Sequence, residues 1–310
     1  MGVSEGEALY GAIEAGGTKF VCAIGAPDRI VQEHVIPTMQ PLETMAEVVR
    51  FFQTAQQQHG ALAGIGIASF GPLQLQRDSP DWGRLLQTPK PGWNAASLTE
   101  PLRAHWPAQP IEIDTDVNAA ALAEASLGTP QAMRALVYVT VGTGIGAGAV
   151  VNGDPLHGRM HPEMGHIYVR RDSRDGAFEG VCPFHGDCLE GLASGPAIHR
   201  RWGSELSKLA IEHEAYPIIG SYLGQLAATI VLTLSPERIV FGGGVMSKGE
   251  LLPHIRAAMR EMLAGYIPPR DGEGAIEDIV VPSQLQGRAG LLGAFLLARR
   301  AVARRLTKES

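Results

Sequence analysis

The sequence predicts an α/β fold with two similar lobes around a central cleft. Segments rich in β-branched residues alternate with helical patterns along the 310 residues, an order typical of α/β proteins. A strand, a glycine turn and a second strand occur at 9–25 and again at 135–151, where Ile13–Thr18 matches Val139–Gly144. Because each copy leads into further strands and helices, the repeat indicates two related lobes with a ligand site between them. A chance recurrence of two glycine turns is the alternative.

The first lobe is expected to continue with one long helix and two more strands. Apolar residues at helical spacing predict a helix over 42–58. The glycine- and isoleucine-rich run 64–69 indicates a buried strand, and a loop rich in Pro, Gly and Asp covers 77–93. Residues 111–114 are a short strand, and an alanine-rich helix follows over 118–127.

The second lobe is expected to be helical after its strand pair. Residues 152–197 are irregular and rich in His, Gly and Cys. The later elements follow from apolar periodicity and glycine stops: helices over 197–213, 217–234, 250–264 and 288–305, and a strand over 238–241. We expect the small lobe to span 1–120 and the large lobe 121–287, with the terminal segment 288–310 packing back on the small lobe.

Composition and charge exclude several classes of protein. The net charge is −6, so a nucleic-acid backbone is not an expected partner. No window approaches about 18 uncharged apolar residues, so no membrane span is expected. Met1–Glu7 lack the basic and apolar regions of a signal peptide, and the three cysteines do not suit a disulfide scaffold. These features predict a cytoplasmic protein in which Cys22 belongs to the core.

Two glycine turns are candidate phosphate-binding loops. Gly16–Lys19 offers backbone amides without obstructing side chains, together with the Thr18 hydroxyl and the Lys19 cation. The same composition also suits an ordinary hairpin. The second turn, Gly142–Gly146, continues as a strand and opens no helix, so a dinucleotide-binding motif is excluded. We interpret the pair as two hairpins that face one triphosphate.

A third glycine run, Gly242–Gly244, follows a strand and leads through Val245 and Met246 toward a helix. Such a turn lets the backbone approach a nucleotide base or a phosphate closely. A simple strand-to-helix connection is the alternative.

Asp116 is the candidate general base. It follows a strand and precedes a helix, at the strand end where ligand sites of α/β proteins form. Phosphoryl transfer to a sugar hydroxyl needs a group that accepts the hydroxyl proton. Asp114 faces the same side by strand alternation but lies further from the strand end. The alternative role for Asp116 is that of a helix cap.

A cluster of histidines and cysteines predicts a structural zinc site. The ligands expected are His166, Cys182, His185 and Cys188, because four such groups suit tetrahedral zinc. His161 is an alternative fourth ligand, and a local disulfide or separate buried residues are the alternatives to zinc. Glu163 and Glu190 flank the cluster, where they either accept hydrogen bonds from sugar hydroxyls or are solvated surface carboxylates.

Together these motifs resemble the ROK family of repressors, open reading frames and sugar kinases, and within it the bacterial fructokinase branch. The stretches that carry the resemblance are Gly11–Cys22 and Cys182–Pro196, and the likeness covers nearly the whole chain. It implies an actin-like ATPase (ribonuclease H-like) fold and ATP-dependent phosphorylation of a hexose. It also implies Mg²⁺ with ATP, a structural Zn²⁺ and a homodimer.

The resemblance implies roles for particular residues. Asp116 matches the catalytic base. The positions that match nucleotide-binding residues are Gly16, Gly17, Thr18, Lys19, Thr143, Gly144, Pro196, Gly242, Gly243, Gly244, Val245 and Met246. The positions that match substrate-binding residues are Gly71, Asp116, Glu163, His166 and Glu190, with His166 also a zinc ligand.

Three departures from the wider family refine the substrate. Many members have Asp where this chain has Glu14, and their zinc run is usually C-x-C-x4-C where this chain has C-x2-H-x2-C. Both variants resemble the fructokinase branch. Thr115 stands where many glucokinase-like members have Asn, which removes an amide partner for a sugar hydroxyl. The resemblance to the fructokinase branch implies phosphorylation of D-fructose at O6 by ATP as the expected reaction.

Other functions remain as alternatives. Within the same class, the alternative is a broad hexokinase such as a mannokinase or glucokinase. A non-catalytic sugar sensor belongs to a different class, and the presence of Thr18, Asp116 and Thr143 argues against it. Repressors of the family carry a helix-turn-helix before the first phosphate loop, and the few residues before Glu14 do not accommodate one.

Overall fold

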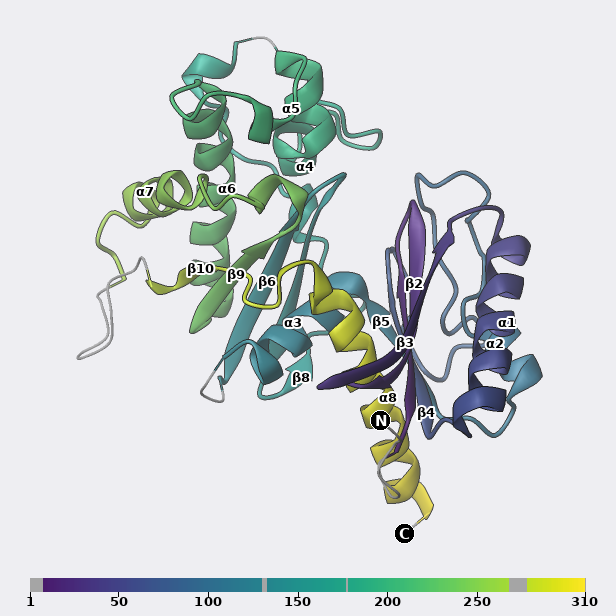
Figure 1. The fold of residues 1–310 in the computed structure, drawn as a ribbon. Helices are drawn as coiled ribbons and strands as arrows, with labels where there is room; N and C mark the ends of the chain where they lie inside the picture. The colour runs from purple at the N-terminus through teal and green to yellow at the C-terminus, as the bar shows by residue number, and fades with distance from the viewer. Residues whose placement is uncertain (1–7, 130–132, 177, 268–277, 310) are drawn as a thin grey trace. The chain divides into compact units, whose positions relative to one another are not determined.

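A computed structural model describes residues 8–129, 133–176, 178–267 and 278–309. The residues that bear on a signal peptide, Met1–Glu7, lie outside this part of the chain. The chain divides into two compact units, each with its own sheet (Figure 1). Unit 1 contains the chain up to Ala123, the segment His157–His161 and the chain from Arg288 onward, and unit 2 contains Glu124–Leu156 and Pro162–Gly287.

Unit 1 is built on a five-stranded sheet in the order β3-β2-β1-β4-β5. Its strands are β1 (Tyr10–Ala15), β2 (Lys19–Ala26), β3 (Arg29–Pro37), β4 (Gly64–Ser69) and β5 (Ile111–Thr115). β1 pairs antiparallel with β2 and parallel with β4, β2 pairs antiparallel with β3, and β4 pairs parallel with β5. The carboxyl ends of β1, β4 and β5 therefore meet at one edge, where a ligand site is expected.

Helices cover both faces of this sheet (Figure 1). One face buries Ile65 and Ile67 in a core with α1 (Pro41–His59) and α2 (Glu100–His105). Alternate residues of a strand point to opposite faces of the sheet, and the residues of the other face pack on α8 (Ala289–Glu309). Gly66 allows this contact: a Cβ there would lie 1.9 Å from the Ala294 carbonyl oxygen. The core of unit 1 also buries Cys22, as predicted.

Unit 2 repeats the strand order of unit 1. Its strands are β6 (Ala135–Val141), β7 (Ile145–Val151), β8 (Asp154–Pro155), β9 (Arg238–Gly242) and β10 (Val280–Pro282). The order β10-β9-β6-β7-β8, read from its other end, is that of unit 1 with each strand replaced by its counterpart. The pairings match too, antiparallel for β6–β7 and β7–β8, parallel for β6–β9 and β9–β10. The repeat that the glycine turns indicated thus extends to the whole sheet.

The helices of unit 2 build a second core around this sheet. They are α4 (Leu189–Ala193), α5 (Gly195–Trp202), α6 (Ala215–Leu234) and α7 (Leu252–Leu263), while α3 (Asp116–Leu127) links the two units in sequence. Short 3-10 turns are η1 (Met164–His166), η2 (Ser173–Asp175), η3 (Leu206–Lys208), η4 (Gly244–Met246) and η6 (Gln286–Arg288). α6 and α7 pack closely, because Gly220 and Gly224 have no side chains. A Cβ at either position would collide with His254 or Ala258 of α7.

Helix α6 corrects one expectation from composition. Among the helices of the described ranges it is long and apolar enough to cross a membrane, with a mean hydropathy of 1.5. However, 61% of the apolar window is buried inside the structure, and residues such as Tyr222 and Ala227 belong to the unit 2 core. A core helix passes the same composition test, so α6 is weak evidence for a membrane span.

The remaining differences from the sequence prediction concern short and edge elements. The helix expected over 197–213 ends at Trp202, because Gly203 adopts a left-handed conformation with φ of 69° and closes the helix. Strands β3, β8 and β10 and the short helices α2 and α4 were not predicted. They lack a clear apolar period, and β3 is an edge strand with mostly accessible side chains.

Candidate active site

The first glycine turn joins β1 to β2 in unit 1. The Gly16 amide donates to the Lys19 carbonyl oxygen at 3.0 Å, and a Cβ on Gly16 would lie 2.9 Å from that oxygen. Thr38, just after β3, donates its hydroxyl to the Gly16 carbonyl at 2.8 Å and its amide to the Thr18 carbonyl at 3.0 Å. Gly17, Thr18 and Lys19 remain exposed. Thr38 therefore fixes the backbone of the turn, while the residues at its tip stay accessible.

Two carboxyl groups with raised pKa values interact near this turn. Burial raises the pKa of Glu14 to about 7, and the charge of Asp116 adds to the increase. Burial also raises the pKa of Asp116 to about 6, although the Val117 amide partly offsets the effect. A carboxylate with a pKa near 6 is ionised at neutral pH and still has proton affinity, as a general base requires. The structure thus places Glu14 close enough to Asp116, the predicted general base, for the charge of Asp116 to raise the pKa of Glu14.

The helix-cap alternative for Asp116 is wrong. The cap at the start of α3 is the Thr115 hydroxyl, which accepts the Asn118 amide at 3.1 Å. Asp116 is the first helical residue, and its Oδ1 accepts the neighbouring Val117 amide at 2.9 Å. Thr115 therefore occupies the cap position, and the Asp116 carboxylate bonds one first-turn amide through Oδ1 only.

The second glycine turn joins β6 to β7 in unit 2 and is braced from two sides. The Gly195 amide, at the start of α5, donates to the Gly142 carbonyl at 2.8 Å. The Ile145 amide donates to Glu190 Oε2 at 3.0 Å, and a Cβ on Gly144 would lie 2.6 Å from the same oxygen. The structure thus groups this turn with the start of α5, where Pro196 is exposed.

The third glycine run lies against the end of β6. Gly243 has a φ of 91°, and a Cβ there would lie 2.4 Å from the Val141 carbonyl oxygen. Gly244 begins the turn η4, which contains Val245 and Met246. A Cβ on Gly195 would lie 3.8 Å from Val245. The predicted nucleotide residues of unit 2 therefore converge around the second turn.

Three glycines in these turns have open space around them. In the described part of the chain, nothing lies within 4 Å of a Cβ built on Gly17, Gly142 or Gly244, and none of the three has a left-handed backbone. Neither packing nor conformation requires glycine at these positions. The open space would let a ligand approach the backbone closely at these three positions.

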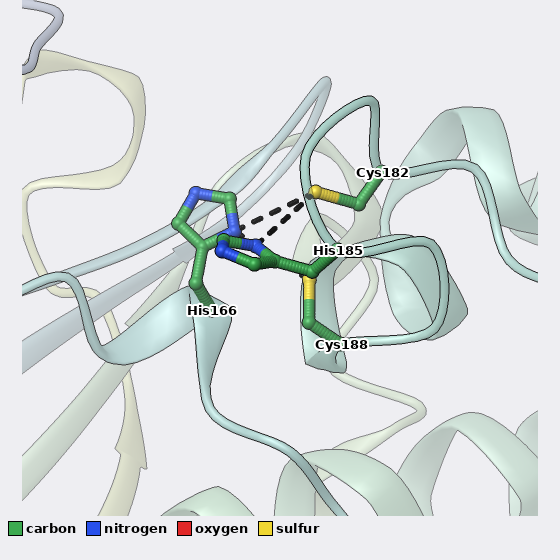
Figure 2. Close-up of side chains that lie close together, drawn as sticks. All are labelled: His166, Cys182, His185 and Cys188. Carbon is green, nitrogen blue, oxygen red and sulfur yellow. Dashed lines mark hydrogen bonds between the residues drawn. The ribbon is translucent and has the colours of Figure 1, made fainter.

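The predicted metal ligands converge in unit 2 (Figure 2). His166, Cys182, His185 and Cys188 offer ligand atoms that all lie within 4.8 Å of one another. His166 Nδ1 lies 3.5 Å from Cys188 Sγ and 3.7 Å from Cys182 Sγ, which is 3.7 Å from His185 Nδ1. Zn–S and Zn–N bonds of tetrahedral geometry place neighbouring ligand atoms about 3.4–3.8 Å apart. The donor set therefore fits one tetrahedral metal ion, and the cysteines are free thiols and form no disulfide.

The structure excludes His161 from this cluster. His161 belongs to unit 1, where its Nε2 accepts the Leu73 amide at 3.0 Å. Its ring lies 3.4 Å from the Cβ position of Gly71, a predicted substrate residue. His166, at the end of η1, takes the place in the cluster.

The two flanking glutamates differ in environment. Glu163 is exposed, and its carbonyl accepts the His166 amide at 3.0 Å. Glu190 is half-buried and supports the second turn through Ile145, a role that the sequence did not suggest.

A network around Asp114 also escaped the sequence analysis. Asp114 is 3% exposed and contacts Asn118 and His157. The sequence did contain one indication of this role, because strand alternation places Asp114 on the same side of β5 as Asp116.

The chain belongs to the ROK family, which it matches over residues 10–301. It is 46% identical to a fructokinase of Zymomonas mobilis over 294 residues, which cover 94% of this chain and 96% of the relative. It is 38% identical to a fructokinase of Pediococcus pentosaceus, over 95% of this chain and 99% of the relative. A ROK hexokinase structure from Thermus thermophilus, 26% identical, superposes with a TM-score of 0.75, covering 96% of this chain and 99% of that one. The predicted family and actin-like ATPase fold are thereby confirmed.

Proposed function

We propose that this chain is an ATP-dependent fructokinase that forms D-fructose 6-phosphate. The observation that carries the proposal is Asp116, which stands at the carboxyl end of β5 with a pKa of about 6 and interacts with Glu14 beside the first glycine turn. The high identity to fructokinases over nearly the full chain supports fructose as the acceptor. Thr115 in place of an amide side chain further disfavours glucose.

Asp116 acts as general base in this proposal. Its carboxylate accepts the proton of the sugar hydroxyl while the hydroxyl oxygen forms a bond to the γ-phosphorus. The bond between that phosphorus and the bridging oxygen breaks, and ADP leaves with the bonding electrons. Protonated Asp116 then returns its proton to solvent.

The nucleotide is held by backbone amides of the glycine turns. The residues proposed for this site are Gly16, Gly17, Thr18 and Lys19 in unit 1, and Thr143, Gly144, Pro196 and residues 242–246 in unit 2. Pro196 has no N–H and the Gly16 amide already donates to the Lys19 carbonyl, so these two residues contribute shape and no amide donor. Mg²⁺ bound with ATP neutralises phosphate charge during transfer. Glu14 suits the neighbourhood of that cation, because burial and Asp116 make its own negative charge unfavourable without one.

We assign the metal cluster to zinc, held by His166, Cys182, His185 and Cys188. The distances between these ligand atoms match a tetrahedral site, and thiolate and imidazole are ligands that zinc prefers. A bound zinc ion would fix the positions of both flanking glutamates. Glu163 lies three residues before the ligand His166, and Glu190 lies two residues after the ligand Cys188. Elemental analysis after metal-sparing purification is expected to give one zinc per chain, and less than about half an equivalent would contradict the assignment.

The sugar is contacted by Gly71, Glu163, His166 and Glu190 in addition to Asp116. We further propose small and large lobes over 1–120 and 121–287 with the terminal segment 288–310 on the small lobe. A homodimer and a cytoplasmic location complete the proposal.

A coupled assay of ADP release across fructose, mannose, glucose and N-acetylmannosamine tests this function. We expect fructose to give the highest kcat/KM, and phosphorus NMR to place the phosphate on O6. Equal rates with mannose or glucose would indicate a broad hexokinase. Absence of sugar-dependent ADP release would refute the kinase, and binding without turnover would favour a sugar sensor.

A further inference from the structure

A short segment of the chain leaves unit 2 and returns to it. The segment His157–His161 follows β8 and precedes η1, and both neighbouring stretches belong to unit 2. The segment itself belongs to unit 1 by its contacts. Its two end residues are histidines, and one contacts the end of strand β5 while the other contacts the loop that follows β4.

The two histidines anchor the segment to neighbouring strands. His157 Nε2 lies 3.0 Å from Asp114 Oδ2, near the end of β5. His161 Nε2 accepts the Leu73 amide at 3.0 Å, in the loop that follows β4. Because β4 and β5 are adjacent and parallel, the His157 anchor lies at the end of the sheet that carries Asp116, and the His161 anchor lies on the loop that leaves the same end.

Asp114 organises the turn between β5 and α3. Its Oδ1 accepts the Thr115 amide and the Asn118 side-chain amide, each at 2.8 Å. Asp116 lies between these two partners in the sequence, so the two bonds define the backbone that carries it. A carboxyl group that is only 3% exposed requires hydrogen-bond partners within the protein, because burial removes its contacts with water.

His157 supplies one such partner from a distant part of the chain. The hydrogen bond to Asp114 raises the pKa of His157, with burial opposing the increase. Glu112 of β5 raises the pKa further and Arg304 of α8 lowers it. His157 is 40% exposed, so it is also the accessible member of the pair.

We propose that His157 is a positioning residue for phosphoryl transfer, which holds Asp114 and thereby the β5–α3 turn that orients Asp116. The proposal rests on the proposed role of Asp116 as general base. An alternative is an ion pair that only stabilises unit 1. If His157 positions the turn, kcat depends on its contact with Asp114 even when the fold is intact. If the pair only stabilises unit 1, kcat does not depend on that contact in a folded variant.

Two amide variants separate these roles. In His157→Gln the side-chain amide nitrogen takes the place of Nε2 and still reaches Asp114, whereas in His157→Asn the amide is too short. His59→Gln, at the exposed end of α1, is the control for loss of a histidine. We expect His157→Gln to retain kcat within about 3-fold. We expect His157→Asn to lose about 10–100-fold in kcat with KM for ATP unchanged, because misplacement of a catalytic group by about 1 Å has effects of this size.

Thermal unfolding of each variant accompanies the kinetics. Equal kcat values for His157→Asn and wild type would overturn the proposal, as would an equal kcat loss in His157→Gln and His157→Asn. If His157→Asn does not fold, Asp114→Asn replaces it. This variant puts an NH2 group in place of Oδ2, which lies 3.0 Å from His157 Nε2, and leaves the weaker contact of Nε2 with Oδ1 at 3.1 Å. A wild-type kcat in Asp114→Asn would then overturn the proposal.

The failure of the fructose assignment would leave this test intact. The sugar panel identifies the accepted hexose, and the variants are compared with that sugar. In the double variant of His157→Asn and Asp114→Asn, we expect a kcat loss no larger than that of the stronger single variant, because both changes remove one contact. Losses that multiply would overturn the inferred coupling. A chain that phosphorylates no hexose would overturn both the proposed function and this inference.

Discussion

The two glycine turns occupy equivalent places in two equivalent sheets, but their surroundings differ. The turn between β1 and β2 has charged neighbours, namely Glu14, Lys19 and, through its electrostatic effect on Glu14, Asp116. The turn between β6 and β7 contains no charged residue and is held by Gly195 and Glu190 instead. The comparison shows that the first turn lies beside two carboxyl groups with raised pKa values, whereas the second turn is braced by backbone and by the Glu190 carboxylate.

The second turn is also linked to the metal cluster along the chain. Glu190, which accepts the Ile145 amide, lies in α4 two residues after the ligand Cys188. The Leu189 amide donates to the Ile167 carbonyl at 2.9 Å, next to the ligand His166. The second turn is therefore connected to the cluster through Glu190 and α4, whereas the first turn is braced by Thr38.

The largest expected effect comes from the charged turn's partner, Asp116. Asp116→Asn removes the proton acceptor and keeps the side-chain shape, so we expect kcat to fall by about 10²–10⁴-fold with nucleotide binding retained. Steady-state kinetics and nucleotide titration measure the two quantities. As its control, Asp81→Asn changes an exposed carboxylate of the loop before α2. Retained turnover in Asp116→Asn would refute the role of general base.

Loss of the metal ligands should affect unit 2 alone. Cys188→Ala removes a buried ligand, and we expect metal content to fall and the free energy of unfolding to drop by several kcal/mol, because a structural metal stabilises the fold that binds it. Calorimetry with and without a chelator checks this expectation. Cys22→Ala is the control, since Cys22 is buried in unit 1 and its loss should leave metal content unchanged. Equal metal content in Cys188→Ala and wild type would contradict the assignment.

A pair of glycine variants tests whether the two turns both approach ATP. Gly17→Ala meets nothing within 4 Å in the described chain, whereas Gly144→Ala would place a Cβ 2.6 Å from Glu190 Oε2. We expect both to raise KM for ATP by about tenfold, because a methyl group blocks the approach of phosphate. Only Gly144→Ala should also lower stability, by about 1 kcal/mol, through displacement of the bond from Ile145 to Glu190. An unchanged KM in Gly17→Ala would contradict a phosphate contact there.

The smallest expected effect concerns the pH dependence of Glu14. Its pKa is raised from 4.5 to about 7 in the fold, so its stabilising contribution is greatest below pH 4.5 and is lost as pH rises through 7. Glu14→Gln should therefore raise the free energy of unfolding by about 1 kcal/mol at pH 8, a value reduced for partial exposure, and have little effect at pH 5. Thermal melts without Mg²⁺ and nucleotide measure the difference. A gain that is equal at both pH values would contradict the raised pKa.

Much of the fold was predictable because its signals are local. The two strand pairs, α1, β4, β9 and α7 follow from apolar periodicity and glycine stops within short windows. The ligand set of the metal cluster was predictable for a similar reason, since Cys182, His185 and Cys188 lie within one loop. Edge strands such as β3 were not predicted, because accessible side chains leave no alternating apolar pattern.

The sequence by itself determined the duplicated strand pattern, the glycine turns, the candidate base and the soft-ligand cluster, because each depends on residues close together in the chain. The tertiary structure alone decided that His166, and not His161, lies with the two cysteines and His185, and it revealed the bond from Ile145 of the second turn to Glu190. It also revealed His157 on Asp114, forty-three positions away. Contacts of this kind depend on the return of a distant segment to the sheet edge, which no local periodicity encodes.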